Sequence, residues 1–329
     1  MQAGPPDQEQ ALNKRFDIVA LGEAMVEFNQ THASEPHYLQ GFGGDTSNAI
    51  IAAARAQARV AYISRVGDDH FGQTLLDLWA REGVDCTAVE RDARAATGVY
   101  FVTHSRPEHG AVPEHTGHRF SYLRANSAAS QMTPQWLDGP AAALIRQARI
   151  LHVSGISMGI SASACDTVFA AIGIAREAGT LVSLDANLRL KLWPLERARA
   201  CIARAVALCD LFLPSHDDAL ALSGLQDPHH ILDWAHAMGA AQVVLKIGAD
   251  GALASDGTRR ERIAGHSVTV QDATGAGDCF GGNLLARLCQ GDDWFHAARY
   301  ANAAAALSVQ GFGAVAPLPR PEQVRKLIA

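Results

Sequence analysis

Short apolar runs alternate along this chain with alanine-rich segments that have the apolar spacing of helices, and this alternation restricts the possible folds more than any other feature. The strand-like runs lie at 17–22, 60–66, 150–155, 181–188, 210–215 and 243–248. Helical patterns occur at 46–58, 70–82, 161–178, 195–207 and 229–238. Strands that alternate with helices predict an α/β fold, with a central, mostly parallel sheet flanked by helices on both faces. In such a sheet, ligands bind at the carboxyl ends of the strands.

Two stretches, drawn from about 27–42 and 97–125, read as strands but are not followed by helices. The second contains two alternating runs, GVYFVTH and HRFSYLR, joined by a loop rich in proline, glycine and histidine. Without helices to cover them, we expect these strands to form a small antiparallel β lid beside the main sheet. A solvated hairpin without a role is the alternative. Because open strand edges invite pairing, we also expect a homo-oligomer, with a dimer through the lid strands as one arrangement.

The composition narrows the class of partner and the compartment. The 329 residues carry a formal net charge of −6 and show no basic stripe, which argues against nucleic acid as a partner. Residues 1–14 are polar and lack the apolar core of a signal peptide, so we expect a disordered tail before one domain at 15–329. No uncharged apolar run approaches membrane-spanning length, so no membrane partner is expected. The six cysteines have no metal-ligand spacing, and we expect free thiols in a cytoplasmic protein.

The stretch QDATGAGDCFGG, residues 271–282, places two glycines before Asp278 and starts an apolar helical pattern at Phe280. Glycine is needed where φ is positive or where the backbone approaches another group closely. The start of a helix favours an acid in its first turn and also presents unpaired N–H groups to an anion. From these residues alone, the stretch is either an ordinary helix cap or a site where an anion meets a carboxylate. The helix N-terminus predicts a low pKa for Asp278.

Other nucleotide-binding motifs are missing from the sequence. There is no G-x-x-x-x-G-K-[ST], and Gly22-Glu23-Ala24 after the first strand is not G-x-G-x-x-G, which weakens the hypothesis of an NAD-dependent dehydrogenase. Glycine clusters instead lie at 41–44, 248–251 and 275–277. The first and the last cluster each end in an acid, Asp45 or Asp278, that leads into a helix.

The pair GGDTSNAI and DATGAGDCFGG, in this order and separation, resembles the signatures of the ribokinase-like (PfkB) carbohydrate kinases. Within that family, LGEAMVEF, FSYLRANSAAS, DANLRLKLW and SVQGFGAVAPLP are most similar to 2-keto-3-deoxygluconate kinases. The resemblance implies a ribokinase-like fold and transfer of the γ-phosphate of ATP to the terminal hydroxyl of that sugar acid. A neutral-sugar kinase of the family (a fructokinase or a ribokinase) and a non-catalytic sugar-binding protein on the same fold remain alternatives.

The resemblance also assigns roles around the transferred phosphoryl group. It implies that Asp278 is the catalytic base and that the amides of Gly275, Ala276 and Gly277 form the anion hole. Phosphoryl transfer needs positioning and charge stabilisation more than a strong base, which suits this arrangement. On the sugar side the resemblance implies roles for Gly43, Gly44, Asp45 and Asn48.

For the nucleotide and its ions, the resemblance implies the following residues. The ATP site draws on Ser215, Lys246, Gly248, Gly251, Gly275, Gly277 and Asn302. Mg²⁺ arrives with ATP, and many relatives bind it through water with the acid of an N-x-x-E segment. Here that segment reads Ser215-His216-Asp217-Asp218, so the role of Asp218 is open. Positions that bind a monovalent cation, such as K⁺, in some relatives correspond to Asp272, Thr274, Ser308 and Gly313.

An acid sugar needs cationic donors for its carboxylate, and arginine meets a carboxylate with two parallel hydrogen bonds. The candidates are Arg124 on the proposed lid and Arg189 at a strand end. Tyr100 and Tyr122 on the lid strands would close over the ligand and hydrogen-bond its oxygens. Surface ion pairs for the arginines and hairpin packing for the tyrosines are the alternatives.

Overall fold

The computed structural model describes residues 14–32, 35–104 and 118–329, so the predicted tail at 1–13 and parts of the lid at 33–34 and 105–117 lie outside the described residues. The strands are β1 Phe16–Leu21, β2 Met25–Gln30, β3 Tyr38–Gly43, β4 Val60–Gly67, β5 Asp85–Asp92, β6 Val99–His104, β7 His118–Leu123, β8 Ala148–Ser154, β9 Leu181–Asp185, β10 Leu211–Phe212, β11 Gln242–Lys246, β12 Ala252–Ser255 and β13 Arg260–Ile263. The α-helices are α2 Asp45–Arg55, α3 His70–Arg81, α4 Pro140–Arg146, α5 Gly155–Gly159, α6 Ala162–Glu177, α7 Leu195–Val206, α8 His216–Ser223, α9 Pro228–Ala237, α10 Ala276–Cys289, α11 Trp294–Ser308 and α12 Pro321–Ile328.

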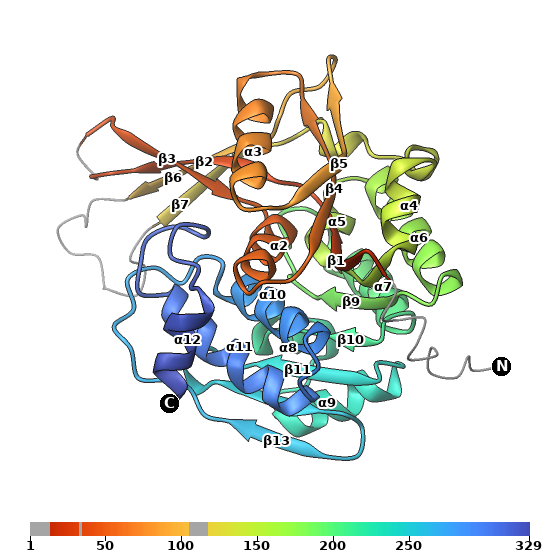
Figure 1. Cartoon of the computed structure of the whole chain (residues 1–329), viewed down its shortest axis with the longest axis vertical. Helices are drawn as coiled ribbons and strands as arrows, with labels where there is room; N and C mark the ends of the chain where they lie inside the picture. The colour runs from red at the N-terminus through yellow and green to blue at the C-terminus, as the bar shows by residue number, and fades with distance from the viewer. Residues whose placement is uncertain (1–13, 33–34, 105–117) are drawn as a thin grey trace.

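A nine-stranded sheet forms the centre of the molecule, in the order β13-β12-β11-β10-β9-β8-β1-β4-β5 (Figure 1). The seven strands from β11 to β5 in this order pair in parallel, and β12 and β13 add antiparallel edges. The strand order across the sheet reverses at β1, which lies between β8 and β4. The α/β fold with a mostly parallel sheet is therefore confirmed, and ligands are expected at its carboxyl edge.

Helices cover both faces of this sheet because its strands are buried on both sides. Along β1, the side chains of Val19 and Leu21 join a core with α4, α6, α7 and α9. Those of Ile18 and Ala20 join a second core with α2, α10, α11 and α12. Alternate residues of a strand point to opposite faces, so a continuous apolar run fills two cores at once.

The helices α2 and α10 pack closely on one face, and each carries a predicted acid in its first turn. Gly282 of α10 lies at their contact: a Cβ there would be 2.1 Å from the carbonyl oxygen of Ala49 and 2.9 Å from Cβ of Ala52. Only glycine permits this approach without displacing backbone. The packing brings Asp45 and Asp278 to the same end of the sheet.

A second sheet of four strands, in the order β3-β2-β6-β7, forms the lid that projects from the main body (Figure 1). Its outer pairs are antiparallel, as expected, while the central pair β2 and β6 runs parallel. Phe28 stacks on Phe101 across that central pair, with ring centroids 5.2 Å apart. The small lid of the predicted fold is therefore present.

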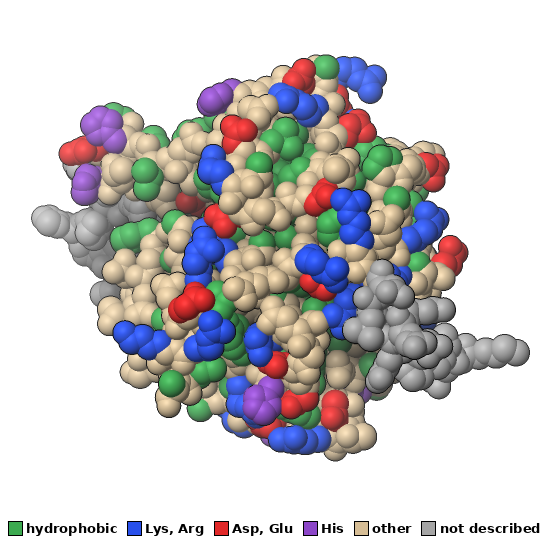
Figure 2. All heavy atoms as spheres, in the orientation of Figure 1, with side chains coloured by type: hydrophobic (Ala, Val, Ile, Leu, Met, Phe, Trp, Pro, Cys, Tyr) green, Lys and Arg blue, Asp and Glu red, His purple; other side chains and the backbone are tan. Residues whose placement is uncertain are grey.

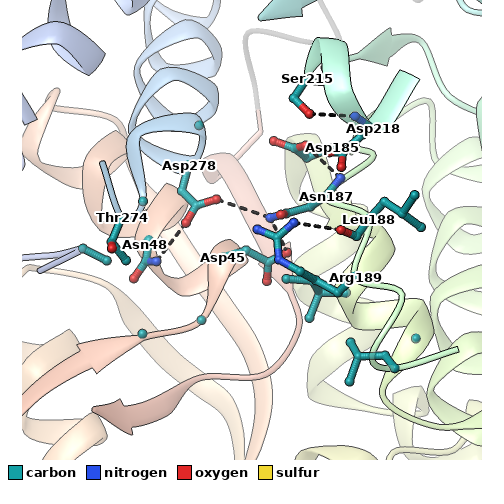
Figure 3. A pocket seen from close by; sticks show the side chains of 18 of the residues that line it. Asp45, Asn48, Asp185, Asn187, Leu188, Arg189, Ser215, Asp218, Thr274 and Asp278 are labelled. Atoms are coloured by element: carbon teal, nitrogen blue, oxygen red, sulfur yellow. Dashed lines mark hydrogen bonds between the residues drawn. The ribbon is translucent and has the colours of Figure 1, made fainter. Parts of the chain in front are cut away.

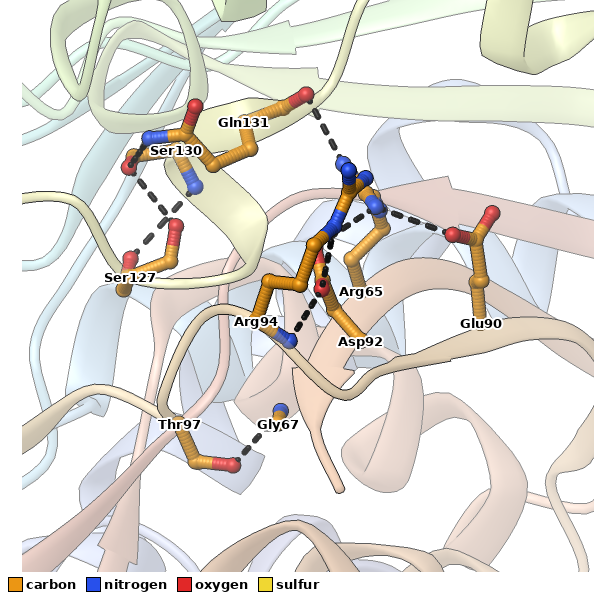
Figure 4. Close-up of polar contacts among 9 residues, drawn as sticks. All are labelled: Arg65, Gly67, Glu90, Asp92, Arg94, Thr97, Ser127, Ser130 and Gln131. Atoms are coloured by element: carbon orange, nitrogen blue, oxygen red, sulfur yellow. Dashed lines mark hydrogen bonds and ion pairs between the residues drawn. The ribbon is translucent and has the colours of Figure 1, made fainter. Parts of the chain in front are cut away.

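Polar contacts fix the base of the lid to the main sheet (Figure 4). Arg65 of β4 pairs with Asp92 at 2.7 Å and donates to the carbonyl oxygen of Gln131 at 2.9 Å. The backbone N–H of Gly67 donates to Oγ1 of Thr97 at 2.9 Å, just before β6 begins. The segment before β6 and the segment after β7 are thus both tied to β4 of the main sheet.

Acidic and basic side chains are interspersed over the face of the molecule shown in Figure 2. Of the helices in the described part of the chain, none combines the length and the apolar character that crossing a membrane requires.

Candidate active site

A cleft of about 1330 Å³ lies at the carboxyl edge of the main sheet. Its walls are formed by the segments that follow β1, β9, β10 and β11, by the first turns of α2 and α10, and by lid strands β6 and β7. The predicted residues that line it are Gly43, Gly44, Asp45, Asn48, Tyr100, Tyr122, Arg124, Arg189, Ser215, Asp218, Lys246, Gly248, Thr274, Gly275, Ala276, Gly277 and Asp278.

The glycine-rich turn before α10 leads into the N-terminus of that helix, and a helix N-terminus is favourable for an anion. Gly275 is the N-cap residue with φ 75°, and a Cβ there would lie 2.8 Å from Cβ of Ala314. The helix begins at Ala276, whose N–H donates to the carbonyl oxygen of Ala273 at 3.2 Å, whereas the N–H groups of Gly277 and Asp278 have no partner within the helix. These donors border the cleft and are suited to phosphate oxygens.

Two side-chain amides hold the Asp278 carboxylate in this turn (Figure 3). Asn48 of α2 donates to Oδ2 at 2.8 Å, and Asn187, after β9, donates to Oδ1 at 3.4 Å. Burial, followed by the nearby charge of Asp45, raises the pKa of Asp278 to about 7. The low pKa expected from the helix N-terminus is therefore wrong, because removal of water and a neighbouring acid outweigh the helix dipole.

Asp45 begins α2 and is buried, and burial raises its pKa above the ordinary value. Its Oδ2 accepts a hydrogen bond from Asn187 Nδ2 at 3.1 Å. Its Oδ1, like Oδ1 of Asn48, has no hydrogen-bond partner among the described residues. Buried polar atoms are nearly always paired, so these two acceptors at the cleft suit the hydroxyl groups of a ligand.

The turn before Asp45 requires glycine. Gly44 has φ 115°, and a Cβ there would lie 2.4 Å from the carbonyl oxygen of Glu23. Gly43 supports the aromatic ring of Tyr100 directly, since a Cβ would meet its hydroxyl at 2.3 Å. In this structure Gly43 therefore makes room for a side chain of the lid.

On the opposite side of the cleft, Lys246 at the end of β11 pairs with Asp185 at the end of β9, at 2.5 Å. The ammonium group also lies 3.3 Å from the position that a Cβ on Gly277 would occupy. A cation is thus held against the glycine-rich turn by a buried acid. This placement differs from the solvated lysine that is common at strand ends.

Ser215 and Asp218 lie next to this pair (Figure 3). Ser215 caps α8, because its Oγ accepts from the backbone N–H of Asp218 at 3.1 Å. Burial and the charge of Asp185 raise the pKa of Asp218. Two acids from different elements therefore face the same part of the cleft, and carboxylate oxygens are suitable ligands for Mg²⁺.

Two residues predicted for the nucleotide do not line this cleft. Asn302 of α11 donates to the carbonyl oxygen of Ala264 at 2.9 Å, which ties the helix to the segment after β13. Gly251 has φ 91°, and a Cβ there would lie 2.1 Å from the carbonyl oxygen of Ile263. In this structure both residues hold neighbouring segments together.

Hydrogen bonds join three of the four residues predicted to bind a monovalent cation. Asp272 accepts from the backbone N–H and the hydroxyl of Thr274, at 2.9 and 2.6 Å, and from the backbone N–H of Gly313 at 2.9 Å. Ser308 instead donates to the carbonyl oxygen of Ala305 within its own helix, at 2.9 Å.

The two predicted arginines have different surroundings. The guanidinium of Arg124 is mostly buried and forms an ion pair with Glu23, which also accepts from the hydroxyl of Ser127 at 2.5 Å. Arg189 is exposed, and its Nη1 donates to the carbonyl oxygen of Leu188 at 2.8 Å. Among the described residues, Arg189 has no acid within ion-pair distance, so it is the arginine available to a ligand carboxylate.

The two lid tyrosines also differ. Tyr100 is buried, and its hydroxyl donates to Oε2 of Glu27 at 2.5 Å. Tyr122 is 41% exposed, stacks on Tyr100 at 5.5 Å and lies 5.9 Å from the guanidinium of Arg124. Tyr122 therefore offers its hydroxyl to the cleft, whereas that of Tyr100 is already engaged.

Sequence reasoning did not single out four acids and amides of this region, namely Glu23, Glu27, Asp185 and Asn187. A signal was present for each: two glutamates inside the apolar run LGEAMVEF, and a polar pair at the end of the strand LVSLDAN. Acids are rarely buried without a partner. Their position in buried strands therefore pointed to specific contacts.

The comparisons with known proteins agree with this geometry. A sequence profile of the pfkB family carbohydrate kinases matches residues 15–321. The chain is 35% identical over 320 residues to a 2-dehydro-3-deoxygluconokinase of Thermoproteus tenax. This alignment covers 95% of this chain and 94% of the relative. The chain is 31% identical over 328 residues to probable fructokinase-7 of Arabidopsis thaliana, covering 95% of this chain and 92% of the relative.

The fold agrees with solved structures as well. A putative ribokinase II from E. coli, in complex with ATP and Mg²⁺, superposes with a TM-score of 0.85 at 26% identity and covers 95% of this chain and 99% of that chain. The resemblance carried by the two glycine-rich motifs is therefore confirmed. This chain belongs to the pfkB family of carbohydrate kinases.

Proposed function

We propose that this protein transfers the γ-phosphate of ATP to the terminal hydroxyl of 2-keto-3-deoxygluconate and forms the 6-phosphate, the activity called 2-dehydro-3-deoxygluconokinase. One observation carries the proposal: the Asp278 turn, the Lys246 cation and the exposed Arg189 line a single cleft. The 35% identity with the Thermoproteus tenax enzyme supports the same substrate.

In this proposal, the oxygen of the sugar hydroxyl attacks the γ-phosphorus of ATP and gives its proton to Asp278, while the bond from that phosphorus to the leaving ADP breaks. The amides of Gly275, Ala276 and Gly277 and the ammonium of Lys246 stabilise the charge that develops on the phosphoryl oxygens. ATP with a divalent metal supplies the phosphoryl group when bound, and the ATP- and Mg²⁺-bound relative supports this pairing. Asp218, beside Asp185, would hold the metal through water, and Ser215 and Gly248 would border the nucleotide.

On the sugar side, we assign Asp45 and Asn48 to hydroxyl groups through their unpaired Oδ1 atoms. Arg189 binds the carboxylate, and Tyr122 covers the ligand from the lid. A K⁺ site at Asp272, Thr274 and Gly313 is part of the proposal, while Ser308 has a separate contact. Since all six cysteines are free, we place the enzyme in a reducing compartment such as the cytoplasm.

One observation favours a neutral-sugar kinase as the second candidate. The pairing of Arg124 with Glu23 neutralises one of the two cations that an acid sugar would use. The similarity to probable fructokinase-7 is consistent with this alternative.

Initial rates of ADP formation with 2-keto-3-deoxygluconate, its galactonate epimer, fructose and ribose test the proposal. We expect kcat/KM for the acid sugars to exceed that for fructose by about 100-fold. Arg189→Ala should remove most of this preference by raising KM for the acid sugar, because hydrogen bonds between charged groups contribute about 1.5–3 kcal/mol. The matched control is Arg94→Ala, because the side chain of Arg94 is 92% exposed. This variant should leave kcat/KM unchanged for both the acid sugar and fructose.

Two results would contradict the proposal. Preference for fructose or ribose would identify a neutral-sugar kinase. Absence of ADP formation with every sugar would favour the non-catalytic sugar-binding protein.

A further inference from the structure

Asn187 lies at the centre of the site in a backbone conformation that asparagine adopts at a cost. Its φ is 31°, in the left-handed region, and it is one of three described residues other than glycine with positive φ. Its backbone N–H donates to Oδ1 of Asp185 at 3.2 Å. Because Asp185 also pairs with Lys246, the turn 185–187 is fixed to the end of β11 as well. Strained residues of this kind persist where the surroundings impose them, often at functional sites.

The side-chain amide of Asn187 lies between the two acids of the site (Figure 3). Its Nδ2 is 3.1 Å from Oδ2 of Asp45 and 3.4 Å from Oδ1 of Asp278. An amide nitrogen has two hydrogens, so it can donate one to each carboxylate. Asn48 donates to the other oxygen of Asp278 at 2.8 Å. Both oxygens of Asp278 are thereby held, one from each side.

We propose that Asn187 is a positioning residue that holds Asp278 and Asp45 at a fixed separation with a single amide group. The inference rests on the proposed role of Asp278 as base and adds a residue that acts through it. A sugar bound by Asp45 then presents its terminal hydroxyl to an Asp278 oxygen whose direction is set by Asn187 and Asn48. A small displacement of the Asp278 oxygen from the sugar hydroxyl would lower the reaction rate strongly, so a residue that fixes this oxygen contributes to kcat.

The charges around this point explain why an amide, and not an acid or an apolar group, occupies position 187. Four acids from four elements form the charged surroundings of position 187: Asp45 of α2, Asp278 of α10, Asp185 of β9 and Asp218 of α8. The positive charges among them come from Lys246 and Arg189. A neutral double donor lowers the repulsion between Asp45 and Asp278 without adding charge. A carboxylate at 187 would join a cluster in which like charges already disfavour ionisation.

The test compares Asn187→Gly with Asn187→Asp, using the sugar that the wild type phosphorylates best. Glycine tolerates positive φ and removes the whole side chain with its amide, whereas aspartate keeps the shape and replaces the donors by a charge. For Asn187→Gly we expect a loss in kcat of about tenfold or more, since a hydrogen bond to a charged group is worth at least that factor. The KM for ATP should stay within about twofold, and the acid limb of the pH profile should move to higher pH. Asn187→Asp should lose more, and its acid limb should move further to higher pH, because an added carboxylate disfavours ionisation of Asp278.

Gln57→Gly is the matched control, because Gln57 also has positive φ (72°) but is exposed and lies outside the cleft. We expect wild-type kinetics for it. Wild-type kcat with an unmoved pH profile in either Asn187 variant would overturn the inference, as would a loss confined to KM for ATP. If Asn187→Gly proves unfolded by circular dichroism, Asn187→Asp decides alone.

Failure of the proposed substrate would leave this test intact, because it uses whichever sugar is phosphorylated. Wild-type protein without any kinase activity would instead refute the proposed function.

Discussion

At the scale of single residues, the site depends on acids whose charge is costly. Asp278, Asp45 and Asp218 all have a raised pKa, and burial is the first cause for each. For a base, a pKa of about 7 is well suited to a reaction near neutral pH, since it balances the ionised fraction against proton affinity. The ionised form of Asp278 that the reaction needs therefore lowers the stability of the folded protein.

Asp278→Asn separates these two effects. We expect kcat to fall by at least about 100-fold, because the amide cannot accept the proton, while ATP binding is retained. The pKa of Asp278 is raised from 3.8 to about 7 in the folded state, so the associated stability is present below pH 4 and is lost as pH rises through 7. The variant should therefore gain stability over the wild type, by on the order of 2 kcal/mol more at pH 8 than at pH 5.

Urea unfolding of both proteins at the two pH values measures this difference. A stability gap that is the same at pH 5 and pH 8 would contradict the raised pKa. Retention of most kcat would contradict the assignment of the base.

At the scale of elements, the sequence predicts those strands and helices whose positions are determined by the local hydrophobic pattern. The alternation of apolar runs locates six of the nine strands of the main sheet and misses β5, β12 and β13. The helical spacing at 70–82 agrees with α3 to within one residue. The run 181–188 predicts a strand throughout, yet β9 ends at Asp185. The three residues that follow leave the sheet because Asp185 bonds the backbone of Asn187. Such a side-chain contact has no periodic signal.

The short strand β10 shows a similar limit. The run 210–215 predicts six residues, but only Leu211–Phe212 form a strand, and Pro214 cannot donate a ladder hydrogen bond. For the site, glycine spacing and an acid at a helix start identified the Asp278 turn. The Glu23–Arg124 and Lys246–Asp185 pairs join residues 101 and 61 positions apart, and nothing local predicts them.

The lid strands carry a prediction of their own. β3 and β7 form the two edges of the lid sheet, and Leu39 and Leu123 on them are 65% and 64% exposed. Open edges with apolar side chains favour pairing with a second copy. We expect a dimer in sedimentation equilibrium that shifts toward monomer in the Leu39→Lys, Leu123→Lys double variant. Ile328→Lys on α12, which alters another exposed apolar residue (48%), should leave the dimer unchanged. A wild type that is monomeric at all concentrations would exclude lid pairing.

At the scale of the whole molecule, the site is assembled by packing between parts that are distant in sequence. Asp45 and Asp278 lie in the first turns of α2 and α10, and the Asn48–Asp278 contact between these helices joins residues 230 positions apart in the chain. Both helices cover the same face of the sheet, and their separation is set by Gly282 against Ala49. The distance between the two acids therefore depends on a contact in the core.

Gly282→Ala tests this dependence. The added methyl group would lie 2.1 Å from the Ala49 carbonyl oxygen, so α2 and α10 must move apart. Overpacking of this kind costs about 1–3 kcal/mol, and the displaced acids should also lower kcat. We expect a lower Tm together with a kcat reduced by about tenfold or more.

The matched control is Gly173→Ala in α6, where a Cβ would meet no atom within 4 Å. The same chemical change there should raise stability by about 0.4–1 kcal/mol, because alanine has less freedom in the unfolded chain and no clash in the helix. It should leave kcat unchanged, since α6 packs on the other face of the sheet. If Gly282→Ala lowers Tm but keeps wild-type kcat, the two acids are positioned by their amide contacts alone, and the helix separation contributes only to stability.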